Sequence, residues 1–143
     1  MADRGQHPLD LVLAALVDRE LDLARGEAFG AGRRSQSVVE LDFRSEAEYA
    51  IARPCVLKDG ELYRMWYPYR GEAYRIGYAE SRDGLSWTRL DQQSGIEPSA
   101  EGWDSEMIEY PVVFDMDGER HMLFNGNAYG KTGVGWAILQ QSV

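Results

Sequence analysis

The sequence predicts a mainly β protein: a partial β-propeller of about two blades, made of antiparallel four-stranded sheets and preceded by an N-terminal α-helix. Two observations lead to this fold class. From residue 38 onward, short β-branched and aromatic runs alternate with Asp-Gly turns, a composition typical of antiparallel strands. The same texture then occurs again at a spacing of 57 to 58 residues, and repeated units of this length indicate propeller blades. A β-sandwich with two similar hairpins is the alternative.

The first 37 residues are expected to form a helix and a linker. In "PLDLVLAALVDRELDLAR", residues 8–25, apolar side chains recur every three or four positions, which predicts a helix with one buried face. Pro8 and Gly26 stand where helices commonly start and end. The glycine- and serine-rich stretch at about 26–37 predicts a linker. The partial propeller then covers 38–143, with blade-like repeats at about 52–90 and 109–139.

Eight strands are expected in the second zone. The turns "KDGE" and "DMDGE" are the expected hairpin connections, because glycine accepts the positive φ that such turns demand. "SRDGLSW", residues 81–87, is expected to be a structural turn held by Ser81 and Asp83, with Trp87 packed between sheets. The expected strands are 38–43, 54–58, 61–68, 74–80, 86–90, 109–115, 119–125 and 133–139.

The two repeats can be aligned by their shared residues. The alignment places one extra residue in the second hairpin, because the spacing is 57 before the turn and 58 after it. The matched positions are Pro54 with Pro111, Asp59-Gly60 with Asp117-Gly118, Trp66 with Phe124, and Gly77 with Gly135.

Composition excludes several classes of function. With 15 basic and 24 acidic residues, the chain has a net charge of -9, which argues against an extended nucleic-acid footprint. The single Cys55 cannot form an intrachain disulfide, and no histidine or cysteine is spaced for a metal. We therefore expect no metal and no cofactor. Neither a signal peptide nor an apolar run of about 18 residues is recognisable, so a soluble cytoplasmic protein without a membrane partner is expected.

The stretch "GWDSEMIEYP" holds three candidate carboxylates. Glu109 is the catalytic candidate, because it opens a strand that would be innermost in a blade, at the mouth of the central channel. Arg53 has nearly the equivalent place in the preceding repeat and can pair with it or hold a polar ligand. Asp104 and Glu106 precede the strand, in a loop that either lines the channel or satisfies its own backbone N–H groups. For Glu109 and Arg53, a structural salt bridge or a solvent-exposed strand end is the alternative.

Further binding candidates surround these charges. Trp103 offers an apolar platform for a sugar ring, or is packed in the core. Tyr110 adjoins Glu109 and is grouped with the site. "FNGNAYGKTG", residues 124–133, carries neutral donors and acceptors suited to hydroxyl groups, or is ordinary loop composition. The equivalent "YPYRGEAYR" of the first repeat contains Tyr67, Tyr69 and Arg70, is more cationic, and suits an anionic sugar or phosphate. The candidates in the 124–133 loop are Asn125, Asn127 and Tyr129.

Four strings, "ARPCV", "YRIGYAESRDGLSW", "GWDSEMIEYP" and "NGNAYGKTG", carry a resemblance over roughly residues 38 to 140. The chain resembles the C-terminal two blades of five-bladed propellers related to glycoside hydrolase families 32 and 43, the invertase, levansucrase and arabinanase relatives. By this resemblance, Glu109 sits where the hydrolases carry an acidic residue of the active centre. Those proteins have five blades in about twice this length and place their base or nucleophile in the first blade. The chain therefore looks truncated, and exposed blade edges or the N-terminal helix would favour a homo-oligomer.

These observations favour a glycosidase-like propeller protein that acts on or binds carbohydrate and completes its site by self-association. If active, it would hydrolyse O-glycosyl bonds. Such cleavage needs two carboxyl groups about 5 to 9.5 Å apart, and the sequence shows no convincing partner for Glu109. Glu106 is a poor one, since side chains three apart on a strand point to opposite faces. A non-catalytic carbohydrate-binding module and a structural, oligomerising module are the alternatives; the sugar, the linkage and the stereochemistry stay open.

Overall fold

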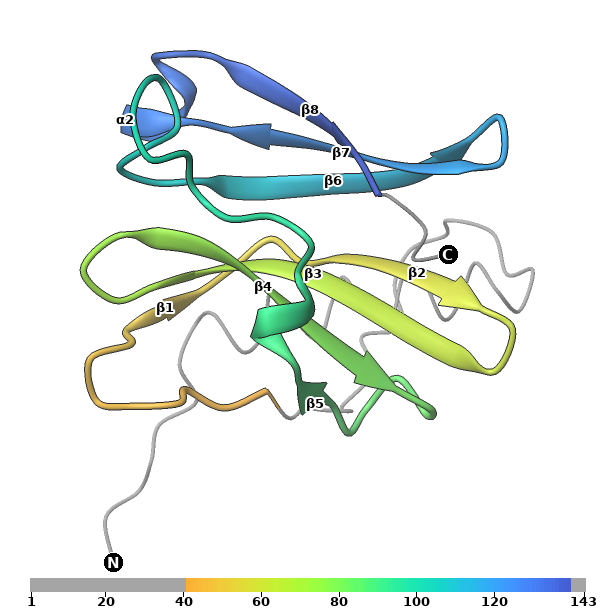
Figure 1. Cartoon of the computed structure of the whole chain (residues 1–143). Helices are drawn as coiled ribbons and strands as arrows, with labels where there is room; N and C mark the ends of the chain where they lie inside the picture. The colour runs from red at the N-terminus through yellow and green to blue at the C-terminus, as the bar shows by residue number, and fades with distance from the viewer. Residues whose placement is uncertain (1–40, 140–143) are drawn as a thin grey trace, which may run out of the picture.

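A computed structural model describes residues 41–139 as two antiparallel β-sheets stacked face to face (Figure 1). The predicted helix at 8–25, its linker and the first part of the 38–43 strand lie outside the described residues. The described part is mainly β, with curled sheets consistent with part of a β-propeller. Across residues 41–139, no helix has the length and apolar character needed to cross a membrane.

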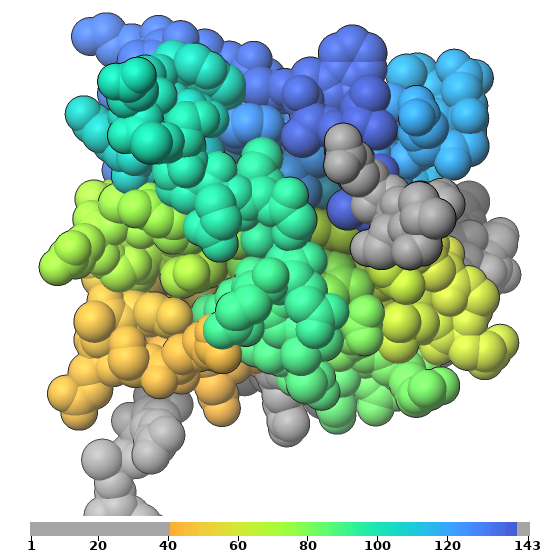
Figure 2. All heavy atoms as spheres, in the orientation of Figure 1, coloured from red at the N-terminus to blue at the C-terminus, as the bar shows by residue number. Residues whose placement is uncertain are grey.

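The first sheet contains four rows of strands, because β1 and β2 lie end to end along the same side of β3. η1, a short 3-10 helix, follows this sheet and starts the segment that leads to the second sheet. In Figure 2 this segment, coloured green to teal, lies across the seam between the two layers. The strands are β1 (Ala50–Ile51), β2 (Cys55–Asp59), β3 (Leu62–Arg70), β4 (Tyr74–Ser81) and β5 (Thr88–Arg89), and η1 covers Asp91–Gln93.

The second sheet has three strands in the order β6-β7-β8 among the described residues, one fewer than the predicted four-stranded unit. A single turn, α2, joins β7 to β8. Its central residues Ala128 and Tyr129 have positive φ angles of 53° and 62°, so this turn is left-handed and departs from a regular helix. The elements are β6 (Glu109–Met116), β7 (Glu119–Asn125), α2 (Asn127–Gly130) and β8 (Val134–Ile138).

Two strand predictions are wrong. Residues 41–43 are not a strand, and the short β1 was not expected. After residue 43 the chain turns: the N–H of Arg44 donates to the Glu48 carboxylate at 2.9 Å, and the N–H of Glu48 donates to the Ser45 carbonyl at 3.1 Å. This turn delivers the next residues to β3, where two of them pair with its end. A strand of two residues is too short to show a period in the sequence.

The predicted position of the inserted residue is also wrong. Cys55 pairs with Trp66 and Val112 pairs with Leu123, so both hairpins keep the same offset of 57 through their turns. The offset becomes 58 only at the next strands, where Tyr67 pairs with Gly77 and Phe124 pairs with Gly135. The extra residue therefore lies in the loop that contains α2. In each sheet a side chain at the glycine would overlap the facing aromatic ring, which explains why both positions are glycine.

The core between the sheets is aromatic and aliphatic. Trp66 and Tyr78 from the first sheet pack with Val113 and Phe124 from the second, together with Ile108. The backbone of Val113 also bonds the Cys55 thiol, with its N–H 3.2 Å from the sulfur. These contacts dock the two layers over the middle of their strands.

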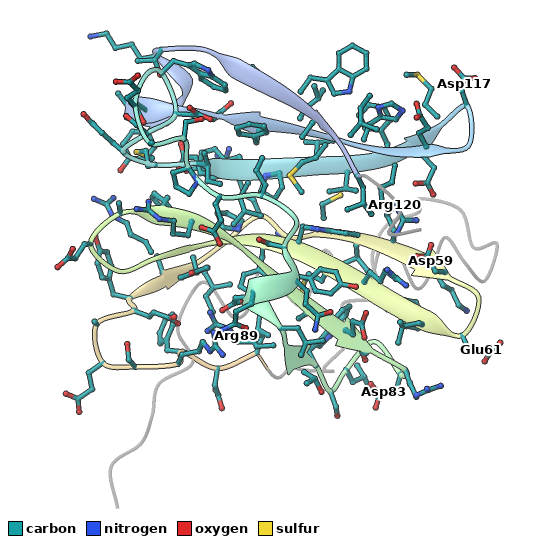
Figure 3. All side chains as sticks on the ribbon, in the orientation of Figure 1. Asp59, Glu61, Asp83, Arg89, Asp117 and Arg120 are labelled. Atoms are coloured by element: carbon teal, nitrogen blue, oxygen red, sulfur yellow. The ribbon has the colours of Figure 1, made fainter. Side chains whose placement is uncertain are left out.

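An ion pair joins the two layers at the hairpin end of the stack. Arg120 on β7 donates two 2.8 Å hydrogen bonds to the carboxylate of Asp59 on β2, and Figure 3 shows the two side chains pointing toward one another. Arg120 holds the pKa of Asp59 below its ordinary value. The bidentate geometry fixes orientation as well as attraction.

The other face of the first sheet is organised by a buried carboxylate. Asp91 of η1 accepts hydrogen bonds from the Tyr67 hydroxyl at 2.5 Å and from the Tyr78 N–H at 3.2 Å. Arg89 donates to the same carboxylate at 2.8 Å and also pairs with Glu48. The predicted turn at 81–87 is confirmed, since the Ser81 and Asp83 side chains accept its backbone N–H groups.

The outer face of the second sheet is apolar and exposed. Residues alternate along a strand, so the neighbours of the core residues Val113 and Met122 point away from the first sheet. Five of these outward side chains are between 37% and 65% exposed: Val112, Leu123, Val134, Trp136 and Ile138. A sheet face of this composition is typical of a surface that another polypeptide covers.

Candidate functional site

The candidate site lies at the end of the stack where β3 ends and β4 and β6 begin, at the left in Figure 1. Glu109, the first residue of β6, is fully buried. Both of its carboxylate oxygens are shielded from solvent and have no hydrogen-bond partner among the described residues. Because a buried ionised carboxylate is costly without partners, this residue calls for a functional or structural explanation.

A β-bulge places Glu109. From Glu109 to Val112 the chain advances three residues on β6, while the paired residues on β7, Asn125 and Leu123, are two apart. The extra residue bends the strand at Tyr110, whose φ is 53°. The N–H of Ile108, just before the strand, donates to the Tyr74 carbonyl at 3.3 Å. This bond ties the start of β6 to the β3–β4 end of the first sheet.

Arg53 lies at an equivalent bulge in the first sheet. Ile51 and Cys55 are four residues apart, while their partners Tyr69 and Trp66 on β3 are three apart. Arg53 has a φ of 42° and precedes a proline, as Tyr110 does. Its structural equivalent is therefore Tyr110, one residue from the Glu109 position that the sequence suggested.

Two arginines and a group of tyrosine rings surround this end of β6. The guanidinium of Arg53 lies 4.3 Å from the centroid of the Tyr110 ring. Arg70, at the end of β3, lies 5.1 Å from the Tyr74 ring and donates a 2.6 Å hydrogen bond to the Tyr129 hydroxyl. Tyr74 in turn contacts Tyr110 and Tyr129, with centroids 6.2 and 6.0 Å away. We call these five residues and Glu109 the Arg–Tyr cluster.

Electrostatics in the Arg–Tyr cluster are dominated by burial. Desolvation raises the pKa of Glu109 to about 6, although the positive charges of Arg53 and Arg70 act to lower it. Burial and the neighbouring Glu109 charge also raise the pKa of Tyr110. A carboxyl group whose pKa is near neutrality can donate a proton at one stage and accept one at another, as a general acid or base does. No carboxylate is among the charges that shift the Glu109 pKa.

The loop at 102–107 is held by Asn127. Its side-chain oxygen accepts the N–H groups of Glu106 and Met107 at 2.8 and 3.1 Å, and its amide nitrogen donates to the Gly102 carbonyl at 3.0 Å. The buried amide of Asn127 thus uses its polar groups within the chain. Glu106 itself is exposed. Asp104 is buried, and its Oδ1 has no hydrogen-bond partner among the described residues.

Trp103 packs beside this loop. Its ring is 38% exposed and stacks on Phe124 with centroids 5.6 Å apart. Asn125 pairs with Glu109 across the strands and packs its side chain against Gly130. The wider position of Trp103 is fixed by Thr132, whose hydroxyl donates to the Trp103 carbonyl at 2.6 Å.

The predicted site residues therefore fall into two groups. Glu109, Arg53, Tyr110 and Tyr129 gather in the Arg–Tyr cluster, with Asn125 beside them. The other four predicted residues belong to the neighbouring 102–107 loop and its Asn127 support: Trp103, Asp104, Glu106 and Asn127. Tyr74 was missed altogether, and Arg70 was noticed only as part of a cationic stretch. The other two side chains of that stretch, Tyr67 and Tyr69, lie toward Asp91 and Arg89.

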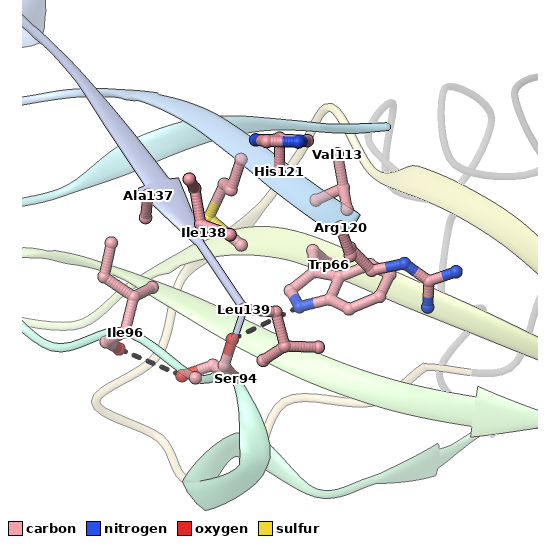
Figure 4. Close-up of a pocket in the computed structure, with 11 residues that line it drawn as sticks. Trp66, Ser94, Ile96, Val113, Arg120, His121, Ala137, Ile138 and Leu139 are labelled. Carbon is pink, nitrogen blue, oxygen red and sulfur yellow. Dashed lines mark hydrogen bonds between the residues drawn. The ribbon is translucent and has the colours of Figure 1, made fainter. Parts of the chain in front are cut away.

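A cavity at the opposite side of the seam is too small for a sugar. Its volume is about 30 Å³, room for about two water molecules. Figure 4 shows Trp66, Arg120 and Ile138 among its lining residues, with the Trp66 indole N–H donating to the Ser94 carbonyl. Arg120 and Asn125 are five residues apart on β7, so the cavity and Glu109 are separated by about 17 Å. Within residues 41–139, no three His, Cys, Asp or Glu side chains are grouped to hold a metal ion.

Comparison with solved structures defines the class of fold. The chain is similar to a structure described as "Glycoside hydrolase", with a TM-score of 0.61, 19% identity and coverage of 77% of this chain and 32% of that one. It is also similar to a structure of a BT0996 RGII complex, with a TM-score of 0.55, 19% identity and coverage of 74% and 36%. The described part thus has a glycoside-hydrolase-like fold, consistent with a portion of a β-propeller.

Two curated proteins of Mycobacterium tuberculosis are closer in sequence. "Uncharacterized protein MT1551" of strain CDC 1551 / Oshkosh is 47% identical over 111 residues. "Uncharacterized protein Rv1502" of strain ATCC 25618 / H37Rv is 46% identical over 111 residues. Each match covers 78% of this chain but only 37% of the relative, so the chain spans little more than a third of their length. No protein-family model matches the chain.

Proposed function

We propose that this chain forms part of the carbohydrate site of a glycosidase-like β-propeller protein, with Glu109 as one of its two working carboxyl groups. One observation carries the proposal: Glu109 is fully buried and unpaired, at the end of a sheet in a glycoside-hydrolase-like fold. Its pKa of about 6 suits a general acid, which must hold its proton until the glycosidic oxygen needs it.

The second carboxyl group comes from outside residues 41–139 in this proposal. Hydrolysis requires a partner about 5 to 9.5 Å away across the sugar, and the charges that act on Glu109 are arginines. Self-association of the chain would complete a propeller ring of five blades and supply that group. The exposed apolar face of the β6–β8 sheet supports such an assembly.

Replacement of Glu109 tests the proposal. The full chain is assayed on aryl glycosides and oligosaccharides, and Glu109→Gln is expected to lower turnover by about a hundredfold or more, the usual contribution of a general acid. Glu106→Gln, an exposed carboxylate three residues upstream, is the matched control and should leave turnover unchanged. Asp104→Asn is measured in parallel, because its unpartnered Oδ1 makes it the other buried candidate. Unchanged turnover in Glu109→Gln would remove this residue from catalysis.

A non-catalytic carbohydrate-binding or oligomerising module is the second candidate function. The observation in its favour is that the Arg–Tyr cluster contains a single carboxyl group within the described residues. Sugar binding by the parent chain without turnover on any member of the panel would select this candidate. Sedimentation velocity then separates its two forms, because the oligomerising module requires a species heavier than the 16.2 kDa chain.

A further inference from the structure

The arginines of the described chain divide into two kinds. Four of them form ion pairs with carboxylates: Arg44, Arg64, Arg89 and Arg120. Arg53 and Arg70 form none within residues 41–139, although both lie close enough to Glu109 to act on its charge. Their guanidinium groups contact tyrosine instead. An unpaired arginine at a candidate site is available for an anionic ligand.

The tyrosines hold these guanidinium groups in place. Arg70 is bonded at one nitrogen to the Tyr129 hydroxyl and lies 5.1 and 5.5 Å from the rings of Tyr74 and Tyr49. Its Nε is buried and has no hydrogen-bond partner among the described residues. Stacking on aromatic faces leaves the N–H edge of a guanidinium free to donate to an oxyanion.

The local charge favours an anion even though the whole chain is acidic. Within the Arg–Tyr cluster, two arginines face one carboxyl group, so the cluster carries one net positive charge when Glu109 is ionised and two when it is protonated. The buried, unpartnered oxygens of Glu109 and the unpartnered Nε of Arg70 belong to this same cluster. A ligand with both hydroxyl groups and an oxyanion would provide partners for each.

We propose that the Arg–Tyr cluster recognises an anionic carbohydrate, and that Arg53 and Arg70 bind its oxyanion, the carboxylate of a uronic acid or a phosphate ester. This inference rests on the proposed function, since it names the class of sugar at the same site. In this arrangement the arginines anchor the charged group, the Tyr129 and Tyr110 hydroxyls lie where they can meet ring hydroxyls, and Glu109 faces the ligand from the start of β6. The arginines are positioning and binding residues, and Glu109 keeps the proton-transfer role.

Matched ligand pairs test the inference on the unaltered full chain. Binding of galacturonic acid oligomers is compared with that of their methyl esters, and binding of glucose 6-phosphate with that of glucose, by calorimetry at constant ionic strength. We expect the charged member of at least one pair to bind about tenfold tighter or more, because hydrogen bonds to charged groups contribute about 1.5 to 3 kcal/mol. The pair that shows the difference identifies the carboxylate or the phosphate as the anion.

Variants assign the effect to the two arginines. Arg53→Gln and Arg70→Gln are each expected to weaken the charged ligand about tenfold and its neutral counterpart less than twofold. Arg82→Gln, an exposed arginine in the 81–87 turn, is the control and should change neither. Arg70→Lys keeps the charge but loses the planar fork, so partial recovery is expected if the geometry of Arg70 matters. Thermal melts confirm that each variant is folded.

The outcomes separate this inference from the proposed function. Equal binding of charged and neutral members would overturn the anionic class while leaving carbohydrate binding intact. A charge preference that survives both Arg→Gln substitutions would also overturn it, because the anion would then be bound elsewhere. Failure of every sugar to bind the unaltered chain would overturn the proposed function and this inference together.

Discussion

The burial of Glu109 makes a specific prediction about stability and pH. The folded protein holds the Glu109 proton up to a pH of about 6, whereas the unfolded chain releases it near 4.5. Between these values the folded state binds more protons than the unfolded state, so this group lowers the free energy of unfolding as the pH rises. Its full favourable contribution is present below pH 4.5 and is lost above pH 6. The difference of about 1.5 pKa units corresponds to about 2 kcal/mol.

The perturbation that reveals this term is Glu109→Gln, which keeps the shape and removes the charge. Urea denaturation followed by tryptophan fluorescence gives the free energy of unfolding of the full chain and the variant at pH 4 and at pH 8. The quantity of interest is the variant minus parent difference, because other titrating groups cancel from it. We expect this difference to become more favourable to the variant by about 2 kcal/mol between pH 4 and pH 8.

The control is Glu106→Gln, whose carboxylate is exposed. Its difference from the parent should stay constant over the same pH range. A constant difference for Glu109→Gln would show that Glu109 has an ordinary pKa, and the argument that burial prepares it as a proton donor would then fail. A change of opposite sign would show that Arg53 and Arg70 outweigh burial and hold the carboxylate ionised.

Three further predictions follow from the scaffold. Asp91→Asn should lower the free energy of unfolding by about 3 kcal/mol, because it leaves buried polar partners and a cation without their carboxylate; a loss below about 1 kcal/mol in urea denaturation would contradict this. Gly135→Ala should cost about 1 to 3 kcal/mol through overlap with a buried ring, whereas Gly71→Ala, whose new methyl has ordinary contacts, should cost much less; equal melting temperatures would refute the argument. If the β6–β8 face mediates self-association, Val134→Glu should shift sedimentation toward the monomer, and an unchanged distribution would exclude that face.

The local pattern predicted most of the sheet structure. Strands β2, β3, β4, β6, β7 and β8 lie within one or two residues of the predicted ranges, because alternating side chains and Asp-Gly turns mark hairpins strongly. The register between repeats was harder. The identical letters of the two Asp-Gly pairs suggested equivalence, but one turn is formed by residues 60 and 61 and the other by 117 and 118. Register depends on cross-strand pairs, which a single sequence does not display.

The candidate site was predictable in part for a similar reason. Glu109 and Arg53 each precede or occupy a strand end marked by a proline, so their local setting could be inferred from the sequence. Tyr74 and Arg70 are 35 and 39 residues away from Glu109 along the chain, and only the stacking of two sheets brings them to it. Their roles as site residues remain predictions, as do those of the other candidates.

Comparison of the two bulges separates what belongs to the scaffold from what belongs to the site. Both sheets contain the same bulge with a positive φ before a proline, at Arg53 and at Tyr110, so this strained backbone is a property of the repeat and does not by itself indicate function. The residue before each bulge differs: the first sheet has Ala52 where the second has Glu109. The repeat therefore provides two equivalent positions at the same end of the stack, and only one of them carries a buried acid. Because packing needs no carboxylate at the first of these positions, the acid at the second is best explained by chemistry that the scaffold does not require.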